Sequence, residues 1–303
     1  MQSPLITVFT PTFNRASYLI RLYQSLVKQT FSSFEWLIVD DGSDDDTAEV
    51  VARLRAESRM TIRYEAQPNS GKHIAINKGA VLAAGELFFI VDSDDILPKN
   101  ALSIIGSQWQ RLQAEGKAEQ YGGLCGLRTY TDGTVIGGDV DYQTLDASLI
   151  KYRYRMGYKG DKAEVFRTDL IRSHPFPIIA GEKFCTEALV WNRIGAVYPF
   201  RFFNAGIYTC EYLAGGLSAN SFRLRRESPQ YASLYYAELL NMPGVVFGHR
   251  IRAAINFWRF ALYNKKDGVR EKYRLANQPW SIVMLPVGYF LYCITKLKYK
   301  TGK

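Results

Sequence analysis

Apolar residues in the first hundred positions alternate between two patterns. Short continuous apolar runs predict buried strands, and apolar residues three or four positions apart predict helices. The predicted strands cover residues 5–10, where the run stops at Pro11, and residues 34–40, 60–66 and 86–92. The predicted helices cover residues 15–29, 44–57 and 72–84. This alternation predicts right-handed crossovers and an α/β fold, with a mostly parallel central sheet flanked by helices.

Polar residues gather where these predicted strands end. The strands are followed in turn by "TPTFNR", "DDGSDDD", "QPNSGKH" and "DSDD". Sheets of this kind bind ligands outside the carboxyl ends of their strands. We therefore expect a ligand site at this edge.

Beyond about residue 122 the pattern loosens. It predicts a hairpin over residues 121–138 with a turn at Asp132 and Gly133. The further predicted elements are a strand and short helix over 160–173, a helix over 185–195, a strand over 201–213, and helices after residue 225. We expect one domain over residues 1–225 and a helical extension over 226–303.

Composition narrows the class of protein. The chain has 303 residues, of which 47% are hydrophobic and 14% aromatic, which excludes a disordered chain. The four cysteines are far apart and form no CxxC pair, which argues against a zinc site and fits reduced thiols in the cytosol. We expect no secretory signal and no run of the roughly 18–20 apolar residues that span a bilayer.

The net charge of +9 comes from the C-terminal part of the chain. Residues 250–303 hold twelve Lys or Arg against Asp267 and Glu271. An apolar, aromatic stretch of about fifteen residues in the tail contains Pro286 and Gly288 and is followed by lysines at positions 296, 298, 300 and 303. The tail predicts either contact with an anionic membrane surface or a helix packed on the domain. No nucleic-acid-binding module is present, so we expect no nucleic-acid partner.

The strongest candidate for metal chemistry is the Asp-x-Asp of Asp92 and Asp94. Mg²⁺ is usually held by one or two carboxylates together with substrate phosphates, although an acidic turn after a strand can also be simply solvated. GxGxxG and Walker A motifs are absent, which disfavours dehydrogenases and P-loop kinases.

Two further sets of residues are candidates for nucleotide binding. Asp40 and Asp41 follow a strand, and a carboxylate there can accept from uracil or ribose, whereas Asp44 to Asp46 are expected to cap the next helix. Lys72 and His73 begin a helix, a position that favours anions, with an exposed surface pair as the alternative.

The segments "TVFTPTFNR", "FEWLIVDDGSDDDT", "NSGKHIAINKG" and "IVDSDD" together resemble the family-2 glycosyltransferases of the GT-A fold. The resemblance implies an inverting transferase that uses a nucleotide-activated sugar with Mn²⁺ or Mg²⁺. It implies that Thr10, Pro11 and Thr12 line the base pocket and that Asp40 contacts the base. It also implies that Asp92 lies near the ribose or metal and that Asp94 binds the metal.

The catalytic base of this family usually lies in an acidic pair that heads a helix, with Trp or Leu four residues on. Glu187 matches the second acid, because Trp191 follows it at that spacing, but Thr186 replaces the first. Glu182 is the alternative base. The loop of residues 214–226 could close over the donor, with Arg223 or Arg225 on the phosphates.

The resemblance implies a hexosyl- or N-acetylhexosaminyltransferase, most often with a UDP-sugar donor. We expect the acceptor to be a glycan or polyprenyl-linked hydroxyl in surface polysaccharide synthesis. We expect a cytoplasmic enzyme, peripheral at the inner face of the cytoplasmic membrane. The alternatives are a non-catalytic binding or assembly protein of the same fold and a sugar nucleotidyltransferase, although "TPTFNRAS" lacks the glycines that the latter would need.

Overall fold

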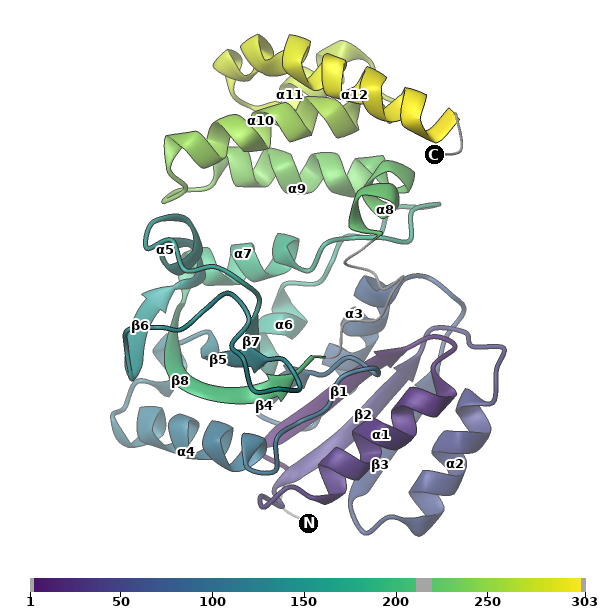
Figure 1. Ribbon diagram of the computed structural model, residues 1–303, viewed down its shortest axis with the longest axis vertical. Coiled ribbons are helices and arrows are strands. Elements are labelled where there is room, and N and C mark those ends of the chain that lie inside the picture. The colour runs from purple at the N-terminus through teal and green to yellow at the C-terminus, as the bar shows by residue number, and fades with distance from the viewer. Residues whose placement is uncertain (1–2, 211–219, 301–303) are drawn as a thin grey trace. The chain divides into compact units, whose positions relative to one another are not determined.

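The computed structural model describes residues 3–210 and 220–300, with side chains as far as Leu297 (Figure 1). The chain divides into two compact units. The first comprises Met1–Leu149, Tyr158–Phe176 and Arg193–Tyr212, and the second comprises Ile150–Gly157, Pro177–Asn192 and Leu213–Lys303. These units are each made of three segments, and the single domain boundary expected after residue 225 stays a prediction.

The first unit is built on a mixed eight-stranded sheet of order β3-β2-β1-β4-β7-β5-β8-β6. The strands are β1 (Ile6–Thr12), β2 (Phe34–Asp40), β3 (Thr61–Ala66), β4 (Leu87–Ile90), β5 (Gly123–Thr129), β6 (Thr144–Ser148), β7 (Lys162–Arg167) and β8 (Pro199–Thr209). Strands β1 to β4 are parallel, as the sequence predicts. β7 runs antiparallel to β4 and β5, β8 is parallel to β5, and β6 is antiparallel to β8.

Helices cover both faces of the parallel strands. The helices of the first unit are α1 (Ala16–Val27), α2 (Thr47–Glu57), α3 (Lys72–Leu82), α4 (Ala101–Ala114), the 3-10 turn η1 (Ala118–Gln120) and α6 (Thr168–Ser173). Val8 of β1 is buried with Leu19 and Leu22 of α1. Phe9 points to the opposite face, where it stacks on Phe88 and lies against α3.

The second unit is helical, as expected after residue 225. It holds α8 (Ser221–Glu227), α9 (Pro229–Asn241), α10 (Phe247–Ala261), α11 (Val269–Ala276), the 3-10 helix η2 (Pro279–Met284) and α12 (Leu285–Lys300). In Figure 1, α9, α10 and α12 lie in successive layers. Trp258 of α10 is fully buried, and its indole N–H donates to the Ser281 carbonyl at 2.7 Å. Helices α5 (Leu149–Tyr154) and α7 (Ala188–Val197) have residues in both units.

One local prediction is wrong and another is confirmed only in part. Pro11 does not end the first strand, since β1 continues to Thr12. Pairing with β4 stops at Phe9, so the missing N–H of Pro11 faces no further ladder partner on that side. The predicted hairpin is confirmed at its turn, because Gly133 has a φ of +86°, Thr129 bridges Val135 in antiparallel fashion, and the Ile136 N–H donates to the Arg128 carbonyl at 2.9 Å. Its return segment is short, and the rest of β5 pairs with β7 and β8.

The tail also corrects an expectation from the sequence. Pro279–Leu297 spans 19 residues with a mean hydropathy of 1.4, so its length and composition suffice to cross a bilayer. Within the described residues, only 17% of its apolar window is buried. The segment is therefore longer than the sequence analysis allowed, and little of it is buried.

We expect Gly79→Ala to destabilise the fold, although alanine is the better helix former. A Cβ at Gly79 would lie 2.1 Å from the Phe9 ring, a clash expected to cost about 1–3 kcal/mol and to outweigh a helix-propensity gain of about 1 kcal/mol. Urea unfolding measures the change. Gly248→Ala in α10 is the matched control, because nothing lies within 4 Å of its Cβ position. Equal stabilities for the two variants would contradict this packing.

Candidate functional site

The acidic turn "DSDD" follows β4 directly. The Asp95 N–H donates to the Asp92 carbonyl at 3.1 Å, which closes the turn. The Asp92 N–H donates to the Tyr208 hydroxyl at 2.9 Å, and that hydroxyl donates to the Asp95 carboxylate at 2.7 Å. The turn therefore has a defined geometry that depends on a residue of β8.

Lys72 at the start of α3 neutralises part of the acidic charge. Its Nζ lies 2.6 Å from Asp92 Oδ1. Burial alone would raise the pKa of Asp92, but the positive charges of Lys72 and Arg128 outweigh burial and lower it. The sequence placed Lys72 and Asp92 at separate strand ends, and the fold joins them as an ion pair.

Asp94 is half-buried beside this pair. Burial and the Asp92 charge raise its pKa, and the charges of Arg15 and Lys72 only partly oppose them. Among the described residues, Asp94 belongs to no ion pair, and no cluster of three or more His, Cys, Asp or Glu could hold a metal by itself. A cation would relieve the excess negative charge, and one or two carboxylates suffice when phosphates supply the other ligands. The residues present therefore fit a divalent cation that arrives with a phosphate ligand.

Asp40 lies at the end of β2, level with Thr12 of β1 and Ala66 of β3. Its carboxylate accepts from the Ser43 N–H and hydroxyl and from the Tyr64 hydroxyl, the last at 2.6 Å. Burial and this hydrogen bond raise the pKa of Tyr64. Three protein donors hold Asp40 in place, and contact with a base remains a prediction.

Asp41 holds the loop that leads into α3. Its carboxylate accepts from the Gln67 side chain and from the Ser70 and Gly71 N–H groups, at 2.7–2.8 Å. Gly71 has a φ of +99°, which glycine adopts without strain. Because Lys72 directly follows Gly71, Asp41 fixes the position of Lys72 through these bonds. A direct contact of Asp41 with a nucleotide stays a prediction.

The threonines and proline at the end of β1 are buried. The Thr10 hydroxyl accepts from the Trp36 indole N–H at 2.9 Å. The Thr12 hydroxyl is buried and has no hydrogen-bond partner among the described residues. Such orphaned polar groups are uncommon in folded proteins, and this one lies level with Asp40.

The loops after β1 and β2 are tied together. The Asn14 N–H donates to Ser43 Oγ, and the Asp44 N–H donates to Asn14 Oδ1. Asp45 accepts from the Ala16 N–H of α1 as well as from Thr47 of α2, so it serves both helix starts. These bonds hold the polar edge together before any ligand arrives.

The expected catalytic base, Glu187, lies in the second unit, as do its alternative Glu182 and the two loop arginines, whereas the residues predicted to bind the nucleotide and the metal lie in the first. Helix α7 begins at Ala188, three residues later than predicted, so Glu187 directly precedes it and remains half-exposed. The alternative, Glu182, is buried and accepts from the Gln230 and Tyr231 N–H groups at the start of α9. Glu182 therefore has a helix-capping role.

Sequence reasoning missed three residues beside the acidic turn, namely Tyr208, Arg128 and Arg15. Arg128 of β5 lies 4.2 Å over the Tyr208 ring. No local motif marks Arg128 and Tyr208, because β5 and β8 reach the turn only through sheet pairing. Arg15 ends the segment "TVFTPTFNR", but nothing in that segment indicates its proximity to Asp94. Of the predicted loop of residues 214–226, residues 214–219 lie outside the described residues, and Arg223 and Arg225 lie in α8.

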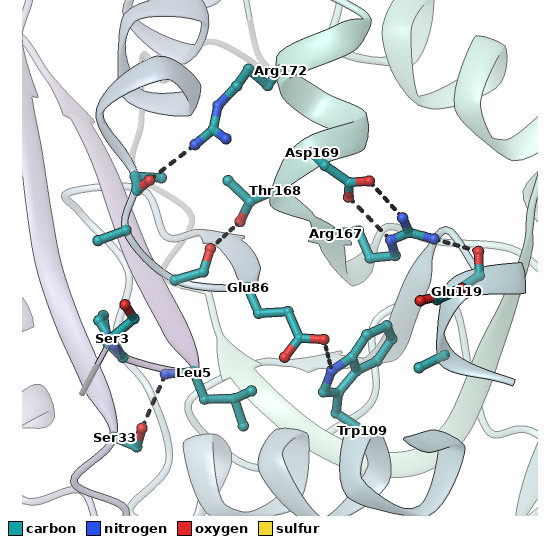
Figure 2. Close-up of a pocket in the computed structure, with 15 residues that line it drawn as sticks. Ser3, Leu5, Ser33, Glu86, Trp109, Glu119, Arg167, Thr168, Asp169 and Arg172 are labelled. Atoms are coloured by element: carbon teal, nitrogen blue, oxygen red, sulfur yellow. Dashed lines mark hydrogen bonds and ion pairs between the residues drawn. The ribbon is translucent and has the colours of Figure 1, made fainter. Parts of the chain in front are cut away.

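A cavity of about 660 Å³ lies at the opposite, amino end of β1 and β4. Figure 2 shows the Glu86 carboxylate facing Trp109, whose indole N–H donates to it at 2.8 Å, and the ion pair of Arg167 with Asp169. Because the cavity adjoins Leu5 and Gly85, which precede the two strands, it is separate from the acidic turn.

Comparison with known proteins gives matches in sequence. The model of glycosyl transferase family 2 matches residues 7–130. Glycosyltransferase GlyG of Streptococcus pneumoniae is 34% identical over 114 residues, which make up 37% of this chain and 38% of that protein. The GalNAc(5)-diNAcBac-PP-undecaprenol beta-1,3-glucosyltransferase of Campylobacter jejuni is 26% identical over 73% of this chain and 71% of that protein. The chain thus spans less than two fifths of the length of GlyG.

Solved structures show the same fold. S. aureus TarS matches 95% of this chain and 52% of its own, with a TM-score of 0.60 and 18% identity. The mannosyltransferase PcManGT from Pyrobaculum calidifontis, solved with GDP-Man and Mn²⁺, matches 98% of this chain and 88% of its own, with a TM-score of 0.56 and 16% identity.

We expect stability to fall on acidification because of His73. This side chain is 1% exposed, and burial lowers its pKa from 6.5 to about 4, with the Asp41 charge opposing the shift. Below pH 6.5 the His73 side chain of the unfolded protein binds a proton, whereas that of the folded protein stays neutral down to about pH 4. The free energy of unfolding therefore decreases as the pH is lowered through this range. At pH 5 the loss is about 2 kcal/mol.

Urea unfolding of the wild type and of His73→Gln at pH 7.5 and pH 5 measures this loss. The variant should lose about 2 kcal/mol less than the wild type between the two pH values. The same pH dependence in both proteins would show that His73 is protonated in the folded state.

Proposed function

Because the chain belongs to the family-2 glycosyltransferases, as the sequence segments implied, we propose that it is an inverting enzyme that uses a nucleoside-diphosphate sugar. The donor is a UDP-sugar, and the acceptor is a hydroxyl of a glycan or polyprenyl-linked sugar in surface polysaccharide synthesis. The observation that carries the proposal is the acidic turn at the carboxyl ends of the parallel strands, with Lys72 paired to Asp92.

The charges at this edge suit a diphosphate that arrives with a cation. Asp94 would hold Mn²⁺ or Mg²⁺, with Asp92 beside it, and phosphate oxygens would complete the ligand set. When bound, the cation would supply charge neutralisation to the departing diphosphate. A TarS fragment has been solved with UDP-GlcNAc and PcManGT with GDP-Man and Mn²⁺, which supports this donor class.

The nucleoside would lie against the ends of β1 and β2. Thr10, Pro11 and Thr12 would line the base, and Asp40, held by Ser43 and Tyr64, would be oriented toward it. The unpartnered Thr12 hydroxyl would gain a partner there. Lys72 and His73 would face the phosphates, with Lys72 supplying charge and a neutral His73 supplying at most a hydrogen bond.

Glu187 would act as the general base. It would take the proton from the acceptor hydroxyl as that oxygen attacks the anomeric carbon from the face opposite the diphosphate. A single displacement of this kind inverts the anomeric configuration. The involvement of Glu182 in capping α9 supports Glu187 as the base.

The polyprenyl-linked acceptor is supported by the Campylobacter jejuni relative, whose name specifies an undecaprenol-linked substrate. Such an acceptor resides in a membrane, and the tail has a surface suited to one. α12 contacts α10 on one side, where Gly288 lies against Trp258. Apolar side chains of α12 are exposed, among them Val287, Phe290 and Leu297.

We therefore propose a peripheral enzyme at the inner face of the cytoplasmic membrane, with α12 as its contact. Lys296 is exposed beside this surface and suits anionic lipid heads. Of the other tail lysines, the side chains of Lys298 and Lys300 and all of Lys303 lie outside the described residues.

The alternative, a non-catalytic protein of the same fold, predicts a different response to two substitutions. For an enzyme, Asp94→Asn should abolish the Mn²⁺-dependent part of UDP binding, measured by calorimetry. Glu187→Gln should keep donor binding while slowing transfer about 10²- to 10⁴-fold, measured as UDP release from a panel of nucleotide sugars. Asp46→Asn is the matched control, since this exposed carboxylate makes no side-chain cap bond to α2.

Wild-type protein that binds no UDP-sugar with Mn²⁺ or Mg²⁺ would refute the proposed activity. Donor binding without turnover, unaffected by Glu187→Gln, would favour the binding protein.

The membrane contact predicts that Phe290→Glu weakens binding to vesicles of phosphatidylglycerol and phosphatidylcholine in a sedimentation assay. The substitution places a charge in the apolar surface and toward anionic lipid, so we expect at least a tenfold loss. Val269→Glu is the control, because Val269 of α11 is 62% exposed, close to the 63% of Phe290. Equal vesicle binding by both variants would mean that α12 does not contact lipid.

A further inference from the structure

Tyr208 is the penultimate residue of β8 and is fully buried, yet its hydroxyl reaches the acidic turn. The O–H donates to Asp95 Oδ2 at 2.7 Å, because an ionised carboxylate can only accept. The same oxygen accepts from the Asp92 N–H at 2.9 Å. One atom thus braces both the first and the last residue of the turn that carries Asp94.

The tyrosine ring is itself held from several sides. Main-chain bonds between Ile96 and Thr209, at 2.9 and 3.1 Å, join the end of β8 to the chain just after the turn. The Phe89 ring of β4 contacts the Tyr208 ring edge-on, with centroids 6.1 Å apart. A hydroxyl on a ring fixed in this way is a rigid anchor.

Arg128 adds a positive charge to this anchor. Its guanidinium carbon lies 4.2 Å from the Tyr208 ring centroid, and its Nε donates to the Lys162 carbonyl of β7 at 2.9 Å. The charge of Arg128 favours the ionised form of Asp92. Strands β5, β7 and β8 carry none of the residues predicted for donor binding. Their residues nevertheless support the turn that carries Asp92 and Asp94.

We propose that Tyr208 is a positioning residue for the donor site, which sets the orientation of Asp92 and Asp94 through its two hydrogen bonds to the turn. This inference rests on the proposed function, because the orientation of Asp92 and Asp94 affects the reaction only if these residues bind the donor and its cation. Without the hydroxyl, the Asp92 N–H and the Asp95 carboxylate each lose a partner, and neither can reach bulk water without the turn moving. Asp92 would then leave its optimal distance from Lys72.

The Tyr208 hydroxyl is buried beside two aspartates of the turn. Burial, together with the charges of Asp92 and Asp95, raises the pKa of Tyr208 well above its usual range. The hydroxyl therefore keeps its proton and its role as donor to Asp95.

A buried tyrosine can also serve the core alone, so the test needs a tyrosine that does only that. Tyr121 is a close match in the same unit, because it is 7% exposed and its hydroxyl donates to the Asp146 carboxylate at 2.8 Å. Its ring also lies near Arg201, with the guanidinium carbon 5.7 Å from the ring centroid, so these polar contacts lie outside the acidic turn. Its partner Asp146 is more exposed than Asp95 and also pairs with Arg201, so Tyr121→Phe should show what the loss of a tyrosine–carboxylate bond outside the turn does.

The first measurement is amide hydrogen exchange in the protein without nucleotide or metal. In Tyr208→Phe, the peptide covering residues 90–97 should exchange about tenfold faster, because the Asp92 N–H has lost its acceptor. In Tyr121→Phe this peptide should exchange as in the wild type, and thermal unfolding should show the smaller stability loss of the two variants, because Asp146 keeps Arg201 and water as partners.

The second measurement is Mn²⁺ affinity in the presence of UDP, by calorimetry. Tyr208→Phe should weaken it about tenfold, and Tyr121→Phe should leave it unchanged. Wild-type exchange of residues 90–97 in Tyr208→Phe, or equal Mn²⁺ affinities for the two variants, would overturn the positioning role. A third outcome separates the two proposals. If the wild type binds no Mn²⁺ with UDP, but residues 90–97 still exchange faster in Tyr208→Phe than in the wild type, the proposed donor site is refuted and Tyr208 remains a residue that holds the turn.

Discussion

The site depends on one electrostatic constraint, which is that three carboxylates crowd into a single turn after a buried strand. Like charges at this separation repel, and a buried carboxylate loses hydration as well, so each needs its own compensation. Asp92 has Lys72 and the charge of Arg128, and Asp95 has the Tyr208 hydroxyl. Asp94 belongs to no ion pair among the described residues, and its raised pKa reflects this.

Hydrogen bonds between the short loops of this edge hold the charged groups in fixed positions. Asp41 fixes the loop before α3 and thereby the position of Lys72. Asn14 and Asp45 tie the loops after β1 and β2 to each other. The positions of the charged groups are therefore set in the folded chain, and a ligand would not have to supply the ordering free energy.

The two units differ in the chemistry that they contribute. The first holds the acidic turn and the strand ends, and the second holds Glu187 and the apolar surface of α12. Donor binding and acceptor chemistry thus belong to separate parts of the chain in the proposed reaction. The match to the family model, over residues 7–130, lies within the first unit.

The sequence by itself determined the parallel half of the sheet, the residues at its carboxyl edge and the resemblance to family 2, because those features lie in local periodicity and contiguous motifs. It also predicted a metal-binding role for Asp92 and Asp94. Only the tertiary structure decided that β1 continues through Pro11, that β5 pairs with β7 and β8, and that Glu182 caps α9. It alone brought Lys72 to Asp92, and Tyr208 and Arg128 to the turn. Contacts between residues 20 to 116 positions apart leave no local pattern, because sheet order and register are fixed by packing over the whole unit.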